Sequence, residues 1–293
     1  MEIEASGLWK RYGATLAVED LSFTVRPGRV TGFAGPNGAG KSTTMRLLLG
    51  LDAPDAGDAR VGGRPYGTIG RPLREVGALL ETAGFHPGRR ARDHLLWLAH
   101  SNDIDRRRVD AVLSTVGLER DAKRRVGGFS LGMRQRLGLA AALLGDPGVL
   151  LLDEPVNGLD PEGIRWIRGF LRALAAEGRT VLVSSHLMSE LEGTADHLIV
   201  IRNGKLIADA PVGELLATAD NSRVAVRTHR AGPLMTVLAD AGARVESAGD
   251  DRLTVTGLEA ERVADLAALE GIPLYELTPA RASLEDVFLE MTR

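Results

Sequence analysis

One short stretch of the sequence, GPNGAGKST, carries the residue types that hold a chain of phosphates. It matches G-x-x-x-x-G-K-[ST], a pattern in which glycines let backbone N–H groups turn inward around phosphate oxygens. In this pattern Lys41 reaches the β- and γ-phosphates, and Ser42 offers a hydroxyl to Mg²⁺. A glycine-rich turn without a ligand is the alternative, and the complete motif favours the phosphate site. The predicted cradle consists of Gly35, Pro36, Asn37, Gly38, Ala39, Gly40, Lys41, Ser42 and Thr43.

Two adjacent carboxylates, Asp153 and Glu154, follow the run GVLLL. Five consecutive apolar or glycine residues indicate a buried strand, which places both carboxylates at its end. There Asp153 is suited to hold Mg²⁺, and Glu154 is suited to orient or deprotonate an attacking water. Surface caps are the alternative for both carboxylates, and the buried run before them disfavours it.

These residues require strands that lead into their loops. RVTGFAG predicts a buried strand before the glycine-rich turn, and KSTTMRLLLG predicts a helix that ends at Gly50. From about His86 to Asp146 the apolar spacing is helical. Alternating strands and helices predict a sheet covered by helices. The other predicted strands are REVGALLE, GVLLLDEP, TVLVSSH and HLIVIRNGKLIA.

The pattern changes near residue 215. Beyond it, short alternating stretches predict strands and amphipathic stretches predict helices. We therefore expect a first domain over 1–215 and a small α+β module over 216–293. The strand candidates are SRVAVRT, ARVES and RLTVTG, and the helix candidates are EAERVADLAALEG and RASLEDVFLEMTR.

Composition excludes several classes of function. The formal net charge of -3 argues against a nucleic-acid partner held by bulk positive charge. The absence of cysteine excludes disulfides and cysteine chemistry, and it fits a reducing compartment. No apolar run reaches the roughly 18 residues of a membrane span, so we expect a soluble chain able to dock on a membrane protein. No zinc site is predicted from His86, His94, His100, His197 and His229, which show no ligand pattern.

Several motifs occur in an order and spacing that resembles the nucleotide-binding subunit of an ATP-binding-cassette (ABC) transporter, over about residues 1–215. The resemblance implies an α/β P-loop NTPase core of the RecA-like type, with a helical subdomain inserted at about 86–146. It also implies ATP and Mg²⁺ as cofactors. The motifs are Gly35–Thr43, FSLGM at 129–133, LLLDEP at 150–155, NGLD at 157–160 and His186.

The resemblance gives Ser130 and Gly132 a role outside their own subunit. In this family the loop that contains them opens a helix whose N-terminus points at the γ-phosphate held by a second copy. A helix N-terminus stabilises anions, so the family's geometry is physically sensible. A simple serine N-cap is the other interpretation of Ser130, and the two are compatible.

Three further residues take roles from the resemblance. Tyr12 matches the aromatic that stacks on adenine, although a half-buried edge tyrosine is the plainer interpretation. Asp160 precedes Pro161 and is a strong N-cap, to which the family adds a contact across the dimer interface. His186 matches the switch histidine that senses the γ-phosphate, whereas a lone histidine is usually structural.

The sequence departs from the common family pattern at two positions. Met133 replaces the glutamine that usually ends the signature, and it lacks that residue's hydrogen bonds. Glu81 stands where a glutamine usually contacts Mg²⁺ and water. A carboxylate is also a competent ligand for Mg²⁺, but its charge is expected to slow hydrolysis or to alter coupling. A solvated loop glutamate is the alternative.

At these two positions the sequence resembles the branch of exporters that includes bacitracin- and daunorubicin-resistance ATPases. The stretch ASLEDVFLEMT resembles the same branch. This implies a cytoplasmic ATPase subunit on the inner face of the membrane. It would act as a dimer and drive efflux of a drug, antibiotic or peptide through a separate permease. The alternatives are an importer ATPase, for which glutamine at position 81 is typical, and a non-transport ABC switch. Basic groups at 88–92, 105–108 and 123–125 indicate a solvated face or a permease contact.

Overall fold

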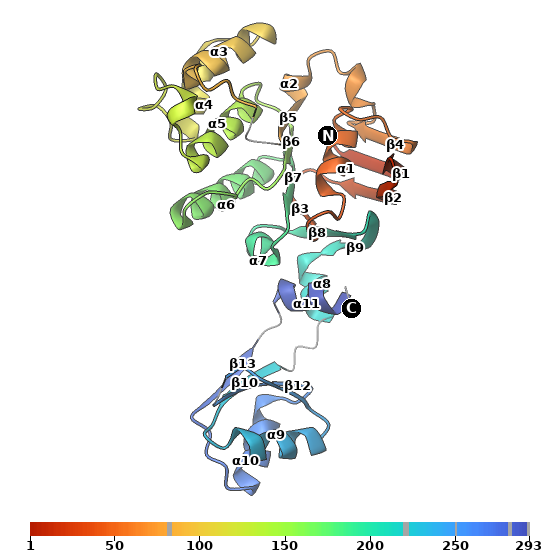
Figure 1. Cartoon of the computed structure of the whole chain (residues 1–293), viewed down its shortest axis with the longest axis vertical. Helices are drawn as coiled ribbons and strands as arrows, with labels where there is room; N and C mark the ends of the chain where they lie inside the picture. The colour runs from red at the N-terminus through yellow and green to blue at the C-terminus, as the bar shows by residue number, and fades with distance from the viewer. Residues whose placement is uncertain (81–83, 219–222, 250, 281–282, 292–293) are drawn as a thin grey trace. The chain divides into compact units, whose positions relative to one another are not determined.

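The computed structural model forms two compact units, Met1–Pro211 and Val212–Arg293 (Figure 1). The division lies four residues before the position at which the sequence pattern changes. Each unit is described by itself below. The structure describes residues 1–80, 84–218, 223–249, 251–280 and 283–291.

A six-stranded sheet in the order β5-β6-β7-β3-β8-β9 forms the centre of the first unit. Its first five strands are parallel, and β9 pairs antiparallel with β8 at one edge. Every residue of β3, β6 and β7 is buried, as expected for parallel strands that are covered on both faces. The strands are β3 (Val30–Ala34), β5 (Val76–Leu79), β6 (Val149–Leu152), β7 (Thr180–Ser185), β8 (His197–Arg202) and β9 (Lys205–Pro211).

Helices cover this sheet on both faces, with α1 on one side and α5 and α6 on the other (Figure 1). α6 shows why its sequence forms a helix. Asp160 accepts a hydrogen bond from the Gly163 N–H at 2.8 Å, and Pro161 occupies the first helical position. The helices of the sheet layer are α1 (Lys41–Leu48), α2 (Pro72–Glu75), α6 (Pro161–Ala176) and α7 (Met188–Leu191).

A second, antiparallel sheet packs against the α1 side and was not foreseen from the sequence. Its order is β2-β1-β4, from β1 (Ile3–Tyr12), β2 (Thr15–Val25) and β4 (Ala56–Val61). Phe23 of β2 meets Phe33 of β3 with ring centroids 5.5 Å apart, so the two sheets share one apolar core. This core fixes the loop between β3 and α1.

The helical insert, taken as residues 86–146, contains α3 (Ala91–Ser101), α4 (Arg107–Thr115) and α5 (Leu131–Leu143). α5 packs very closely on β5. A Cβ added at Gly77 would lie 2.1 Å from the Ala142 carbonyl oxygen, and one added at Gly138 would lie 2.5 Å from Leu79. Glycine therefore permits this helix to approach the central sheet.

The second unit contains a four-stranded antiparallel sheet in the order β11-β12-β10-β13. One helix follows β10 and one follows β12, so the elements run β-α-β-β-α-β, which is the split β-α-β arrangement. Val224, Leu234, Leu253 and Val263 belong to its separate buried core. Its elements are α8 (Val212–Thr218), β10 (Arg223–Arg227), α9 (Ala231–Asp240), β11 (Arg244–Ser247), β12 (Arg252–Thr256), α10 (Ala260–Leu269), β13 (Glu276–Ala280) and α11 (Leu284–Met291).

Within the described parts of the chain, no helix combines the length and apolar character needed to cross a bilayer.

The close contact of β5 with α5 gives a prediction about stability. Gly77→Ala should lower the free energy of unfolding by about 1–3 kcal/mol, because its Cβ overlaps the Ala142 carbonyl. Gly169→Ala is the matched control, since Gly169 lies in α6 with nothing within 4 Å of an added Cβ. This control should be neutral or raise the free energy by up to about 1 kcal/mol. Urea unfolding followed by circular dichroism measures both, and equal midpoints for the two variants would contradict the packing argument.

Candidate functional site

The stretch Gly35–Thr43 comprises the turn between β3 and α1, residues 35–40, and the first three residues of α1, as the predicted strand, glycine-rich turn and helix imply. Gly38 and Gly40 have φ of 80° and 106°, a conformation that favours glycine. A Cβ at Gly40 would also lie 2.4 Å from the Ala17 carbonyl oxygen. The turn therefore needs glycine for both backbone conformation and space, and it leads directly into the N-terminus of α1, which favours bound anions.

This turn lines a cleft of about 210 Å³ together with Glu154 and the beginning of β2. The cleft thus brings together the predicted phosphate cradle and one of the two predicted carboxylates, which lie far apart in sequence. The lining residues are Thr15, Leu16, Ala17, Asn37, Gly38, Gly40, Lys41, Ser42, Thr43 and Glu154.

Lys41 is a nearly buried cation, with 6% of its surface exposed. Its Nζ donates to the carbonyl oxygens of Gly35 at 2.7 Å and Pro36 at 3.2 Å, and lies 3.8 Å from Glu154 Oε1. Burial lowers the pKa of Lys41, while the negative charges of Glu154 and Asp153 act in the opposite direction. The ammonium is thus held at the cradle by backbone dipoles and by a carboxylate.

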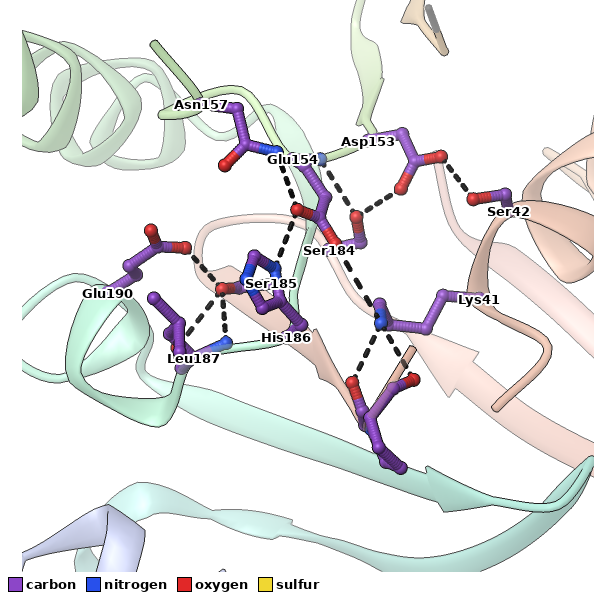
Figure 2. Close-up of polar contacts among 12 residues, drawn as sticks. Lys41, Ser42, Asp153, Glu154, Asn157, Ser184, Ser185, His186, Leu187 and Glu190 are labelled. Atoms are coloured by element: carbon purple, nitrogen blue, oxygen red, sulfur yellow. Dashed lines mark hydrogen bonds and ion pairs between the residues drawn. The ribbon is translucent and has the colours of Figure 1, made fainter. Parts of the chain in front are cut away.

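Asp153 lies at the end of β6, between the cradle and β7 (Figure 2). Its Oδ2 accepts a hydrogen bond from Ser42 Oγ at 2.6 Å, and its Oδ1 accepts one from the Ser184 hydroxyl. A hydroxyl oxygen and a carboxylate oxygen are therefore adjacent at the edge of the cleft. These are the oxygen donors that Mg²⁺ prefers.

Two side chains hold one carboxylate oxygen of Glu154, and Lys41 Nζ lies 3.8 Å from the other. Its Oε2 lies 2.7 Å from His186 Nδ1 and accepts a hydrogen bond from Asn157 Nδ2, also at 2.7 Å (Figure 2). His186 thus contacts the carboxylate through Nδ1, and the direction of this hydrogen bond follows the histidine tautomer. The arrangement holds the Glu154 carboxylate at the cleft and places His186 beside it.

The predicted residues of the opposite half-site lie elsewhere in the unit. Ser130 caps α5 by accepting from the Met133 N–H at 3.2 Å, and Asp160 caps α6. A Cβ added at Gly132 would lie 3.0 Å from the Gly158 carbonyl oxygen, so this glycine packs on the loop that follows Glu154. Of the residues that the structure describes, neither Ser130, Gly132 nor Asp160 lines the cleft.

Tyr12 lies at the end of β1, and its hydroxyl is engaged by a neighbouring carboxylate. Its hydroxyl donates to Asp52 Oδ2 at 2.5 Å, and Arg46 Nε also bonds that oxygen at 2.8 Å. These bonds, with Arg46 contributing most, lower the pKa of Asp52 to about 2. Tyr12 is 45% exposed and is not among the described residues that line the cleft. Glu81, the other predicted metal ligand, lies outside the described residues.

Sequence reasoning missed two side chains of the site. Ser184 lies in TVLVSSH and bonds both Asp153 and the backbone of Glu154. Asn157 lies in the NGLD motif, and its side chain donates to the Glu154 carboxylate, a contact that was not predicted. In the described ranges, no group of three or more histidine, cysteine, aspartate or glutamate side chains is placed to hold a metal. Mg²⁺ usually takes only one or two carboxylates, with the remaining ligands from water and phosphate.

Comparison with family models gives two matches. A model described as "ABC transporter" matches residues 18–157, which include the cradle, the signature stretch and both carboxylates. A second model, described as a domain of unknown function, matches residues 222–285 in the second unit.

Curated relatives extend the likeness. The chain is 43% identical over 216 residues to the bacitracin transport ATP-binding protein BcrA of Bacillus licheniformis, covering 73% of this chain and 71% of that protein. It is 37% identical over 300 residues to the Nod factor export ATP-binding protein I of Burkholderia orbicola, covering 99% and 96%. A solved dimeric bacterial ABC transporter cassette, MJ0796, shares the fold, with a TM-score of 0.65 and 22% identity over 72% of this chain and 98% of that one.

The buried position of Lys41 gives a prediction about nucleotide affinity. Lys41→Ala should weaken ATP binding by roughly 10- to 100-fold, the range expected for one lost charge-assisted hydrogen bond. Titration calorimetry of the whole chain measures it. Lys123→Ala removes an exposed lysine in the helical insert and should leave the dissociation constant unchanged. Equal ATP affinities for the two variants would show that Lys41 does not contribute to ATP binding.

Proposed function

We infer that this chain, which belongs to the ATP-binding proteins of ABC transporters, drives export of a drug, antibiotic or peptide through a separate permease. The family is that of ATP-hydrolysing subunits, and one observation connects this chain to the reaction. Glu154 is fixed by His186 and Asn157 in the same cleft as the phosphate cradle. Export is supported by the names of relatives that match this chain, two of which concern bacitracin transport and Nod factor export.

Mg²⁺ is proposed as the metal that accompanies ATP. The adjacent oxygens of Ser42 and Asp153 fit it, because both are hard donors and they lie beside the cradle. Glu81 is proposed as a further ligand on the basis of the family pattern. When bound, Mg²⁺ neutralises charge on the phosphate oxygens and favours phosphoryl transfer.

The chain's own residues then divide the work of hydrolysis. The backbone N–H groups of the cradle and Lys41 bind and orient the β- and γ-phosphates. Glu154 orients the attacking water or accepts a proton from it. His186 holds the Glu154 carboxylate through Nδ1, and the histidine faces the γ-phosphate. Asp153 keeps Ser42 in place through its 2.6 Å hydrogen bond.

A second subunit is proposed to complete each site. The cleft holds the phosphate cradle and the base, but Ser130 and Gly132 lie at the start of α5. In a head-to-tail dimer, this helix N-terminus of one copy would face the γ-phosphate bound by the other, with Asp160 at the interface. Tyr12 is proposed to stack on adenine, which requires its ring to contact the base while its hydroxyl stays on Asp52.

The helical insert is proposed as the docking surface for the permease. Trp97 of α3 is 54% exposed, and the Arg89 guanidinium lies 5.1 Å from the centre of its ring. An exposed aromatic beside a cation is typical of protein interfaces. Such docking would hold the chain on the inner face of the cell membrane. Co-purification with a permease, followed by stimulation of ATPase activity by its transported compound, tests the proposal of export.

The assignment of Glu154 as general base gives the main prediction for activity. Glu154→Gln should leave ATP binding intact, slow hydrolysis by about 10²–10⁴-fold, and accumulate an ATP-bound dimer. Phosphate release and light scattering measure the two effects.

The matched control is Glu177→Gln, which changes an exposed glutamate at the far end of α6. Its turnover should equal that of the wild type. Near-normal turnover by Glu154→Gln would instead show that another group activates water.

A further inference from the structure

The backbone of Glu154 adopts an unusual conformation. Its φ is 48°, in the left-handed region that residues other than glycine rarely occupy. Such conformations persist only when the surroundings hold them, and they concentrate at functional sites. At this position the conformation sets the direction in which the carboxylate leaves β6.

Two side chains from different elements hold this residue's backbone. The Glu154 N–H donates to Ser184 Oγ of β7 at 2.9 Å, and the Glu154 carbonyl accepts from Gln135 Nε2 of α5 at 3.1 Å. The Glu154 carbonyl also accepts from the Asn157 N–H at 3.2 Å, so Ser184 holds the backbone donor, and Gln135 shares the backbone acceptor with the following turn. The carboxylate itself is held separately by His186 and Asn157.

Gln135 stands out on its helix. It is 2% exposed and lies among the buried apolar residues of α5, such as Leu137 and Leu139. A buried amide is costly unless it is hydrogen bonded, and the Nε2 of Gln135 donates to the Glu154 carbonyl. This polar residue therefore has a specific task at a position where an apolar residue would pack more simply.

The first turn of α5 also touches the loop that follows Glu154. A Cβ added at Gly158 would lie 2.3 Å from the Leu131 side chain, and one added at Gly132 would lie 3.0 Å from the Gly158 carbonyl oxygen. The helix therefore contacts this segment at Glu154 and again at Gly158. The segment 154–158 is therefore connected to α5 at two places.

We propose that Gln135 is a positioning residue for Glu154 and that it links this carboxylate to the helix that begins at Ser130. The inference rests on the proposed function, in which Glu154 is the general base and Ser130 faces the ATP of the second copy. Each α5 would then connect two nucleotide sites, one through Ser130 and the other through Gln135. Seating of the helix N-terminus on the partner's ATP would hold Glu154 in its own site in the reactive orientation.

The test removes the donor while keeping the volume. Gln135→Met should lower kcat by about 10- to 100-fold, the scale of a misplaced catalytic group, and leave the KM for ATP within about twofold of wild type. An ATP-bound dimer should accumulate, whereas a variant that is only less stable would not accumulate one. Leu139→Met is the matched control, because it exchanges a buried residue one turn along the same helix and should keep wild-type kcat.

A double-mutant cycle with Glu154→Gln separates positioning from a general structural role. If Gln135 acts through the Glu154 carboxylate, Gln135→Met should not slow the residual hydrolysis of Glu154→Gln any further. Equal slowing in both backgrounds, or an unchanged kcat in Gln135→Met alone, would overturn the inference. Near-normal turnover by Glu154→Gln alone would instead refute the proposed function, so the two failures are distinguishable.

A second variant covers the case in which Gln135→Met does not fold. Gln135→Glu keeps the size of the side chain, but its ionised carboxylate has no donor for the Glu154 carbonyl. It should show the same loss of kcat with an unchanged KM, and wild-type kcat in this variant would overturn the inference.

Discussion

The site depends on the parallel register of three neighbouring strands, β6, β7 and β3. Leu152 pairs with Val183, and Ala34 pairs with Ser185, so the three strands end at one edge of the sheet. Asp153 then lies level with Ser184, to which it is hydrogen bonded. A register slip of one residue would turn these side chains to the opposite face, because successive residues of a strand point to alternate sides. The chemistry at this edge is therefore set by strand pairing inside an apolar sheet.

Charge balance at that edge complements the register. Lys41 is almost fully buried, and a buried cation without a partner is strongly destabilising. Backbone carbonyls of the cradle and the Glu154 carboxylate supply its partners. The same groups that stabilise the free chain thus hold the cleft ready for a triphosphate. The left-handed backbone at Glu154 is kept by hydrogen bonds from β7 and α5, which connects the edge of the sheet to the helical insert.

Local patterns in the sequence predicted much of this arrangement. The glycine-rich turn, the buried strand before Asp153 and the Asp160–Pro161 helix start each depend on residues that are neighbours in the chain. REVGALLE was predicted as one strand, whereas Pro72–Glu75 forms a short helix and only Val76–Leu79 joins the sheet. In the missed sheet of β1, β2 and β4, the hairpin of β1 and β2 is local, whereas β4 pairs with β1 across more than 30 residues of sequence. The contacts of Gln135 and Ser184 with Glu154 were missed because each spans many residues and leaves no local pattern.

We propose that each chain carries two incomplete halves, the cleft with Glu154 and the helix start at Ser130, which become active only against a second copy. The most direct test is ATPase activity per chain across a dilution series, with molecular mass measured by light scattering at each ATP-loaded concentration. The account predicts that activity per chain follows the dimer fraction and approaches zero when only monomers remain. Undiminished turnover per chain in a solution of monomers would contradict it.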